Sequence, residues 1–268
     1  MQQEYIDRIY KLFKFNAVWF PGTPIGLGDV VTIDNGSMFI VNNLTKLGVQ
    51  SHLSDTCIQR QAVESQSFSI AQGASYRIKL AGSPNLGNSH LDINQAGLSI
   101  DFESGLSVFL FLGGTVLETY NNIEDIHKEL QALYIKGKFS KRSYFVSHIL
   151  KAEKAMIFIS NGEKGAIEFS MGDNPKLDSN IGSLFKANLE MSLVYNQNVG
   201  YSLIHDINLA GHHIVPMVKL SGIYDVYFHN NPFLNIFPYS RFSRIDQVTP
   251  MDVIENDATL TFGFYKPS

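Results

Sequence analysis

The amino-acid sequence predicts an α+β fold, a twisted and mainly antiparallel sheet with an N-terminal helix and at least one further helix at its edges. From residue 66 onward, apolar and polar residues alternate with a period of two over several segments. This pattern is typical of strands that bury one face. Charged residues make up only 17% of the 268-residue chain, and Phe and Tyr are frequent. Such a composition favours strands over long exposed helices.

The first element predicted is a helix over residues 4–15, because apolar side chains recur there with helical spacing and lysines lie off that stripe. A loop rich in Gly and Pro follows at residues 21–29. Residues 30–33 and 37–41 then read as a hairpin that turns at Asp34, Asn35 and Gly36. A short helical turn is expected near residues 44–47.

The sheet is expected to begin with a series of alternating strands. These strands cover residues 66–70, 76–80, 91–94 and 98–103, and the apolar run at 108–112 is expected to be more fully buried.

A helix over residues 123–134 interrupts the strands. Asn121 is expected to cap it, with Glu124 three residues later, and Gly137 is expected to end it. Strands resume at 144–150 and 155–160, with a turn at residues 161–162 leading into 166–170. Two further pairs are expected, at 189–195 with 201–207, and at 213–220 with 223–228 around a turn at Ser221 and Gly222.

The chain is expected to divide into a single α+β domain over residues 1–229 and a tail over residues 230–268. The tail contains four prolines and a group of acidic residues without basic ones between them. We expect it to pack on the domain rather than to fold independently.

No segment carries a recognisable catalytic signature. The glycine-rich loop at residues 22–28 follows a helix and precedes a strand, and it lacks the Gly-Lys-Ser/Thr end of a phosphate-binding loop. The single cysteine, Cys57, excludes an internal disulfide and a cysteine zinc cluster. We therefore expect no catalytic residues and no cofactor.

Three histidines near a turn leave one alternative open. His205, His212 and His213 lie on or beside neighbouring strands, and together they have the chemistry of a zinc site. No HExxH-like spacing supports a metal there, so this remains the weaker reading. It belongs to the hypothesis that the protein is an enzyme of unrecognised family.

A basic stretch between residues 128 and 164 stands out in a chain whose net charge is −4. Such a stretch is able to dock on the headgroups of anionic lipids. Nucleic acid is not expected as a partner, because no RNA-binding motif is present. The candidate membrane-binding residues are Lys136, Lys138, Lys141, Arg142, Lys151 and Lys154.

The middle of the chain resembles the pore-forming domain of gasdermins. The resemblance rests on the order of a helix at 123–134, a basic loop at 136–142, the strand Tyr-Phe-Val-Ser-His-Ile-Leu at 144–150 and the strand Met-Ile-Phe-Ile at 156–159. The segments at 189–195 and 201–204 correspond to a later strand pair. One departure is that bacterial gasdermins carry a lipidated cysteine near the N-terminus, whereas the single cysteine here is Cys57.

The resemblance implies a latent, membrane-acting, pore-forming protein that is released by cleavage or displacement of its C-terminal tail, in a role such as bacterial defence. It implies a cytoplasmic protein that moves to the inner face of the membrane on activation. The partners implied are anionic lipid, an activating protease and further copies of the chain. A non-enzymatic binding or scaffold protein remains the other alternative. The residues expected to insert into the membrane are Leu98, Ile100, Phe102, Val108 and Leu110.

Overall fold

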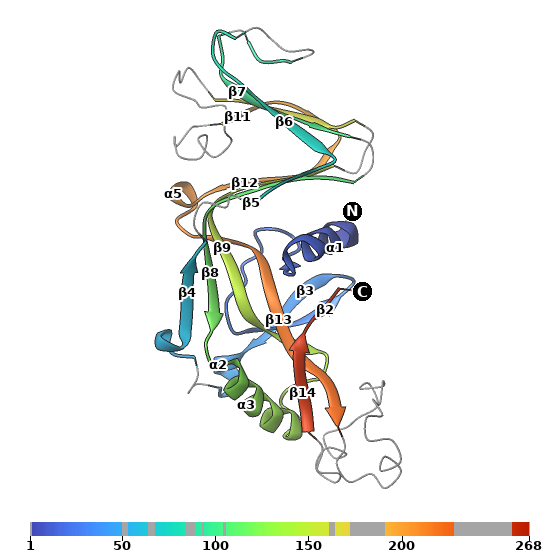
Figure 1. Cartoon of the computed structure of the whole chain (residues 1–268), viewed down its shortest axis with the longest axis vertical. Coiled ribbons are helices and arrows are strands. Elements are labelled where there is room, and N and C mark those ends of the chain that lie inside the picture. The colour runs from blue at the N-terminus through green and yellow to red at the C-terminus, as the bar shows by residue number, and fades with distance from the viewer. Residues whose placement is uncertain are drawn as a thin grey trace.

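The computed structural model describes residues 2–49, 53–63, 68–83, 89–92, 94–103, 106–160, 164–171, 191–227 and 259–267 (Figure 1). Its helices are α1 (Gln2–Phe13), α2 (Leu44–Leu47), η1 (Asp55–Cys57), α3 (Ile123–Ile135) and α5 (Ile207–Ala210). Its strands are β1 (Asn16–Ala17), β2 (Asp29–Asp34), β3 (Ser37–Asn43), β4 (Ile58–Ala62), β5 (Phe68–Gln72), β6 (Ala74–Lys79), β7 (Gly97–Phe102), β8 (Ser107–Tyr120), β9 (Ser143–Ser160), β10 (Ala166–Ser170), β11 (Ser192–Gln197), β12 (Val199–Asp206), β13 (Ile214–Tyr227) and β14 (Thr259–Phe264). The predicted α+β class is confirmed.

A large antiparallel sheet forms the body of the molecule. Its strands run in the order β1-β13-β9-β2-β3, and β8 and β12 also pair with β9. Strand β8 pairs with β4 along its second half and with β5 along its first half. The long strand β9 therefore lies at the centre of the sheet, because four different strands pair with it along its two edges.

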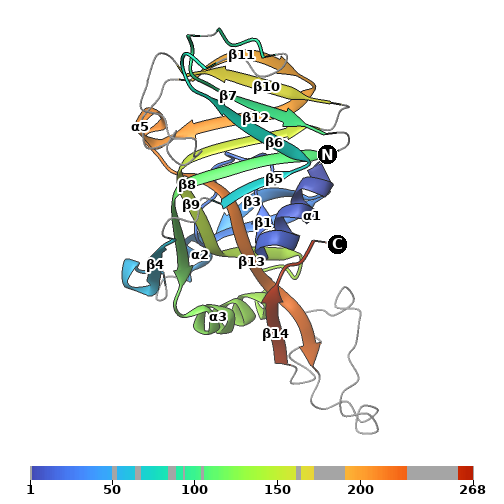
Figure 2. The same cartoon turned by 45° about the horizontal axis from the view of Figure 1, so that its top comes forward.

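A second sheet of four strands, in the order β11-β10-β7-β6, lies over one end of the large sheet. Figure 2 shows it stacked above β5, β8, β9 and β12. All of its pairs are antiparallel.

Helices pack on the large sheet and close its cores. Tyr5, Ile6 and Ile9 of α1 are buried against β8 and β9, as the apolar stripe of that helix predicts. Helix α3 buries Ile126, Leu130 and Tyr134 in a separate core near β2 and β4.

Some local predictions were wrong, and tertiary contacts explain each one. Residues 213–228 do not form a hairpin, because β13 runs straight through Ser221 and Gly222. A side chain at Gly222 would lie 2.7 Å from the ring of Tyr144, so the glycine allows β13 to approach β9 rather than making a turn. Likewise β9 is one continuous strand rather than two.

Two further corrections concern the segments on either side of β7 and β8. The described part of residues 91–94 is not a strand, because it crosses over the second sheet instead of pairing within it. The N-cap position of α3 is Asn122 rather than Asn121, and its side chain makes no capping hydrogen bond. The amide of Asn121 instead donates to the carbonyl of Cys57, which extends the pairing of β4 with β8.

The C-terminal strand β14 lies in the predicted tail and pairs with β13 from Tyr227↔Thr259 to Ser221↔Phe264. The rest of the predicted tail, apart from residues 265–267, lies outside the described residues, as do its acidic residues. The division at residue 229 stays a prediction.

Candidate functional site

The two sheets are joined strand by strand across one bend. Gly73 joins β5 to β6, residues 103–106 join β7 to β8, residues 161–165 join β9 to β10, and Asn198 joins β11 to β12. The paired order is β5-β8-β9-β12 in the large sheet and β6-β7-β10-β11 in the second sheet. Each strand therefore keeps the same neighbours on both sides of the bend. We call these eight strands the folded ribbon (Figure 2).

The backbone at the bend depends on two residues with a positive φ angle, one at each edge of the ribbon. Gly73 has φ +67°, and a side chain there would lie 2.8 Å from the hydroxyl of Ser107. Asn198 also has a left-handed backbone, with φ 56°, which Asn tolerates better than most residues. The sharp turn from one sheet to the other is thus encoded locally at both edges of the ribbon.

Two buried serines donate hydrogen bonds to backbone carbonyls at the bend. Ser107 and Ser160 are register partners on β8 and β9, and both are fully buried. The hydroxyl of Ser107 donates to the carbonyl of Glu103 at 3.3 Å, and that of Ser160 donates to the carbonyl of Asn198 at 2.7 Å. Backbone pairing between neighbouring strands continues into the bend, since Glu103 N donates to the carbonyl of Gly73 at 2.7 Å. The strands therefore stay bonded to their neighbours at the bend.

The space inside the folded ribbon is apolar. We call it the inter-sheet core, and among the described residues twelve buried side chains make it up. They are Ala74, Ala96, Leu98, Ile100, Phe102, Phe109, Phe111, Met156, Phe158, Ile167, Phe169 and Met171.

The opposite face of the ribbon differs between its two halves. In the large sheet it is also apolar, because Val108, Leu110 and Leu112 point into the core beneath α1. In the second sheet the opposite face is polar. Arg77 of β6 and Asp101 of β7 form an ion pair there at 2.6 Å, with both side chains about half exposed.

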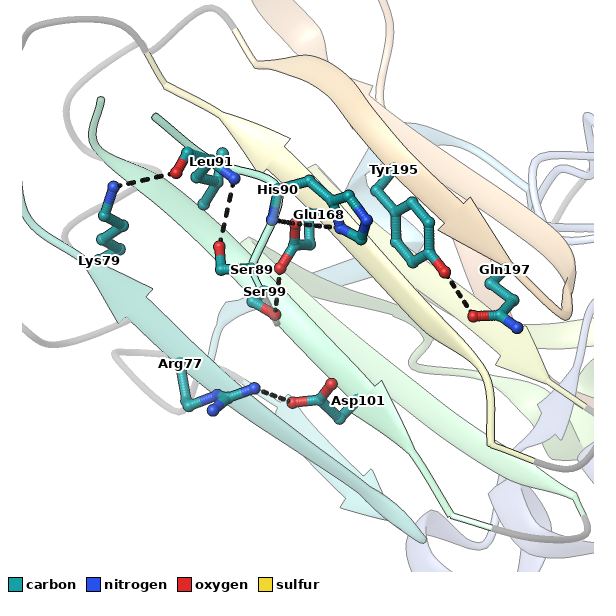
Figure 3. Close-up of polar contacts among 10 residues, drawn as sticks. All are labelled: Arg77, Lys79, Ser89, His90, Leu91, Ser99, Asp101, Glu168, Tyr195 and Gln197. Atoms are coloured by element: carbon teal, nitrogen blue, oxygen red, sulfur yellow. Dashed lines mark hydrogen bonds and ion pairs between the residues drawn. The ribbon is translucent and has the colours of Figure 1, made fainter. Parts of the chain in front are cut away.

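A short strap, residues 89–92, crosses the polar face of the second sheet (Figure 3). The amide of His90 donates to the carboxylate of Glu168 at 2.7 Å, and the hydroxyl of Ser99 donates to the same group at 3.3 Å. The ring of His90 stacks on Tyr195 at a centroid distance of 3.9 Å. Glu168 is only 4% exposed, so the strap covers a carboxylate on the polar face of the second sheet.

The predicted inserting residues all belong to the folded ribbon, but they lie on two faces. Leu98, Ile100 and Phe102 point into the inter-sheet core, whereas Val108 and Leu110 point toward α1. Phe109 and Phe111 hold the positions on β8 that face the inter-sheet core, and sequence reasoning missed them. The apolar run at 108–112 has no polar alternation from which the two faces could be told apart.

The predicted membrane-binding residues do not form one patch. Lys136, Lys138, Lys141 and Arg142 lie in the connection between α3 and β9, at the end of the body opposite the second sheet (Figure 1). Lys151 and Lys154 lie midway along β9. Each is paired with an acid, Lys151 with Glu118 at 2.8 Å and Lys154 with Asp206 at 3.3 Å. The role of all six residues in lipid binding stays a prediction.

Glu118 is the centre of a small ionic network beside Lys151. Burial raises its pKa, but the hydrogen bonds and charges of Lys151 and Arg60 outweigh burial, and the net result is a lowered pKa. Arg60 donates to Glu118 at 3.1 Å and also to Asp55 at 3.0 Å. The network therefore neutralises Lys151 within the protein.

The glycine-rich loop and the three histidines, which are far apart in the sequence, line the same pocket. It has a volume of about 710 Å³ and lies between residues 22–27 and the strands β9, β12 and β13. His205 Nε2 donates to the carbonyl of His212 at 2.9 Å, and the two rings lie 5.4 Å apart. Within the part of the chain that the structure describes, no group of three metal-ligand side chains is arranged to hold an ion.

No helix among the described residues has the length and apolarity needed to cross a membrane.

Comparison with known proteins supports a weak likeness. No known protein family and no curated protein matches the chain. The chain is similar in structure to the gasdermin A3 membrane pore seen by cryo-electron microscopy, with 11% identity, a TM-score of 0.33 and coverage of 86% of this chain and 96% of that one. It is also similar to a bacterial gasdermin from Bradyrhizobium tropiciagri, with 10% identity, a TM-score of 0.33 and coverage of 81% and 85%. The resemblance to gasdermins predicted from the sequence is confirmed as a weak one.

Proposed function

We propose that the protein is a latent pore former whose folded ribbon straightens to cross a membrane. One observation carries the proposal: the two sheets have the same strand order and are joined strand by strand. Opening the ribbon at its bend therefore leaves every strand beside its present neighbours. The hydrogen bonds between strands do not have to be exchanged, which removes the largest barrier to such a change.

Straightening turns the inter-sheet core into a single outer surface. A strip that is folded on itself and then opened carries both of its inner faces on one side. Leu98, Ile100 and Phe102 of β7 and Phe109 and Phe111 of β8 would then lie on one side of the same straightened strand. The polar face of the second sheet, with Arg77 and Asp101, lies on the other side. The half of the ribbon made by the second sheet would then have one apolar and one polar face, which suits lipid on one side and water on the other. In the half made by the large sheet, the opposite face is apolar and is covered by α1.

The lengths of the strands fit a bilayer. Even the shortest of the four continuous strands, residues 68–79, is longer than the roughly 10 residues that a tilted strand needs to cross the hydrocarbon layer. The edges of the ribbon, β5–β6 and β11–β12, have no further strand beside them among the described residues. In lipid those edges must pair with neighbouring copies, because unpaired backbone groups are costly there.

The free energy of the inter-sheet core explains why the ribbon stays folded in water. Twelve buried side chains, at roughly 2 kcal/mol each for the larger ones, give a stabilisation on the order of 20 kcal/mol. Exposing them to water would lose that stabilisation. Exposing them to lipid would not, since lipid chains are as apolar as the core. The membrane itself is thus the condition that favours the open form.

The C-terminal segment is the proposed restraint. β14 pairs with β13, which pairs with the first half of β9, the strand that leads into the bend. Residues 264–266 also line a pocket with Tyr10 and Lys14 at the end of α1, and α1 covers the second apolar face of β8. Loss of the segment would loosen both contacts. Cleavage or displacement anywhere between β13 and β14 would have this effect.

A cleavage-triggered leakage experiment tests the proposal. A protease site is inserted between residues 230 and 258 of the full chain, and dye-loaded vesicles with and without anionic lipid are added. We expect leakage only after cleavage, and more from the anionic vesicles. If the cleaved protein leaves both kinds of vesicle intact at micromolar concentration, the proposal is wrong.

A charge test then identifies the pore-lining face. Asp101→Asn and Arg77→Gln should shift the ion selectivity of the pore in opposite directions, because the two side chains lie together on the polar face. The swapped pair, Arg77→Asp with Asp101→Arg, serves as the matched control and should restore selectivity. Leakage with selectivity unchanged in both single variants would mean that another surface lines the pore.

A further inference from the structure

A second pocket lies where α1, β1, β13 and the C-terminal segment meet. It has a volume of about 380 Å³, and Figure 2 shows the C-terminal end of the chain beside α1. None of the six predicted lipid-binding residues lines it. The pocket is also separate from the folded ribbon and from the pocket that contains the histidines.

The described wall of the pocket gathers positive charge. Lys14, Lys219 and Lys266 line it, and none of its described residues is a carboxylate. In the part of the chain that the structure describes, none of these three lysines forms an ion pair. The negative charge of Asp7 helps to raise the pKa of nearby Tyr265, but Asp7 does not line the pocket. Three unpaired ammonium groups around one cavity repel one another, and a bound anion would relieve that repulsion.

Lys219 is the most unusual of the three. It lies on β13 between the fully buried residues Val218 and Leu220, and its own side chain is half-buried. Its ammonium group is 4.7 Å from the ring centre of Phe15 and 5.8 Å from that of Phe264. Burial lowers the pKa of Lys219. A charged group held in a partly apolar place without a counter-ion is costly for folding, and such groups occur most often at binding sites.

The remaining wall is aromatic and carries one unused polar group. Tyr10, Phe264 and Tyr265 line the pocket, and Phe264 is 46% exposed. Asn16, which is 2% exposed, also lines it, and its side-chain oxygen has no hydrogen-bond partner among the described residues. Flat rings beside lysines suit a ligand that has both a planar ring and an anionic group. The volume is at the lower end of the range for small-molecule sites.

We propose that this pocket binds a soluble organic phosphate with a planar ring, such as a nucleoside monophosphate. The phosphate lies among Lys14, Lys219 and Lys266, and the ring lies against the aromatic wall. The ligand touches the end of α1, β13 and the C-terminal segment together, so its binding holds that segment on the body. The binding site stands without the proposed pore function, and only this effect on release rests on it.

Calorimetric titration of the full chain tests the site. The probes are adenosine monophosphate, inorganic phosphate, adenosine and vesicles that contain phosphatidic acid. We expect adenosine monophosphate to bind at least tenfold more tightly than phosphate or adenosine. Lys219→Met should weaken this binding at least tenfold. Lys128→Met is the matched control, because Lys128 lies on α3 and pairs with Asp125 at 2.7 Å, and its binding should equal that of the wild type.

Each other result of the titration decides for or against the proposed ligand site. If Lys219→Met fails to fold by circular dichroism, Lys14→Gln on the exposed rim replaces it with the same expected loss. The proposal is overturned if adenosine monophosphate binds no better than phosphate, or if neither lysine variant weakens it. Binding to the phosphatidic acid vesicles alone would show that the phosphate belongs to a lipid, which also overturns a soluble ligand. Leakage is measured separately, so failure of this site leaves the pore test unaffected.

Discussion

Acidification should release the C-terminal strand, because two histidines pack against it in their neutral form. His127 of α3 stacks on Phe262 with ring centres 4.3 Å apart, and it shares a hydrogen bond of 2.9 Å with Ser221. His148 of β9 meets the edge of Phe264 at 5.6 Å. Both phenylalanines belong to β14. Undocking of β14 would therefore expose both imidazoles at once.

The size of the effect follows from the pKa of the two histidines. Burial lowers the pKa of His127 to about 4, and burial with the charge of Lys219 lowers that of His148 to about 4. The free imidazole has a pKa of about 6.5. The neutral form is thus favoured when β14 is docked. Its stabilisation is complete above about pH 6.5 and is lost as the pH falls toward about 4.

At pH 5 the two shifts correspond to roughly 2 kcal/mol for each histidine. Both rings are partly exposed, so solvent screening reduces this, and we expect about 2 kcal/mol for the pair. That is a change of about thirtyfold in the equilibrium for undocking β14. Since unfolding of the whole protein also exposes the rings, the measurement must report on β14 itself.

Hydrogen exchange of the peptide that covers residues 259–267 is the appropriate assay. Its protection, corrected for the intrinsic pH dependence of exchange, should fall about thirtyfold between pH 7.5 and pH 5. In the double variant His127→Gln with His148→Gln, the corrected protection should change little over that range. If wild type and variant lose protection equally, carboxylates rather than the histidines control the strand, and the reasoning is refuted.

Three further predictions concern the ribbon and its neighbours. Gly73→Val should destabilise the bend by about 2 kcal/mol, because it forces a positive φ on a branched residue. A lower Tm, together with vesicle leakage at a lower protein concentration, would show this effect. An unchanged Tm would contradict it. Glu168→Gln should weaken the bond to the His90 amide by about 1 kcal/mol and make the strap the first site of limited proteolysis, whereas an unchanged cleavage pattern would count against that role. Glu118→Gln should lower the free energy of unfolding by about 2 kcal/mol, because it leaves Lys151 without its partner. Adding Lys151→Met should recover most of that loss in urea unfolding, and no recovery would mean that the pair contributes nothing.

The elements that could be predicted from the sequence are those set by local pattern. The stripe of α3 and the alternation of β7 depend on residues within one element, and both appear where they were expected. The likeness to gasdermins was also visible, because it rests on the order of such elements. The predicted boundaries of elements were wrong where a contact with a residue far away in the sequence set the structure. At Gly222 the deciding feature is the ring of Tyr144, which lies far away in the sequence.

The candidate site could be predicted only in part. Val108 and Leu110 were predicted to insert into the membrane together with Leu98, yet β8 is apolar on both sides, and only packing shows that Phe109 and Phe111 share the inter-sheet core with Leu98. Similarly, the sequence of the basic stretch between residues 128 and 164 does not reveal which of its basic side chains pair with an acid. Lys151, for example, finds its acid on a neighbouring strand rather than nearby in the chain.

The sequence by itself determined the helices α1 and α3 and most of the strands, since period and turn chemistry act over a few residues. It determined as well that the chain is rich in strands with few charges. The tertiary structure alone decided that four long strands fold back at one bend. The alternation of β6 and β7 would be the same in a straight ribbon and in a folded one, and the choice between them depends on where the apolar face is buried. In water that face is buried against the other half of the ribbon itself.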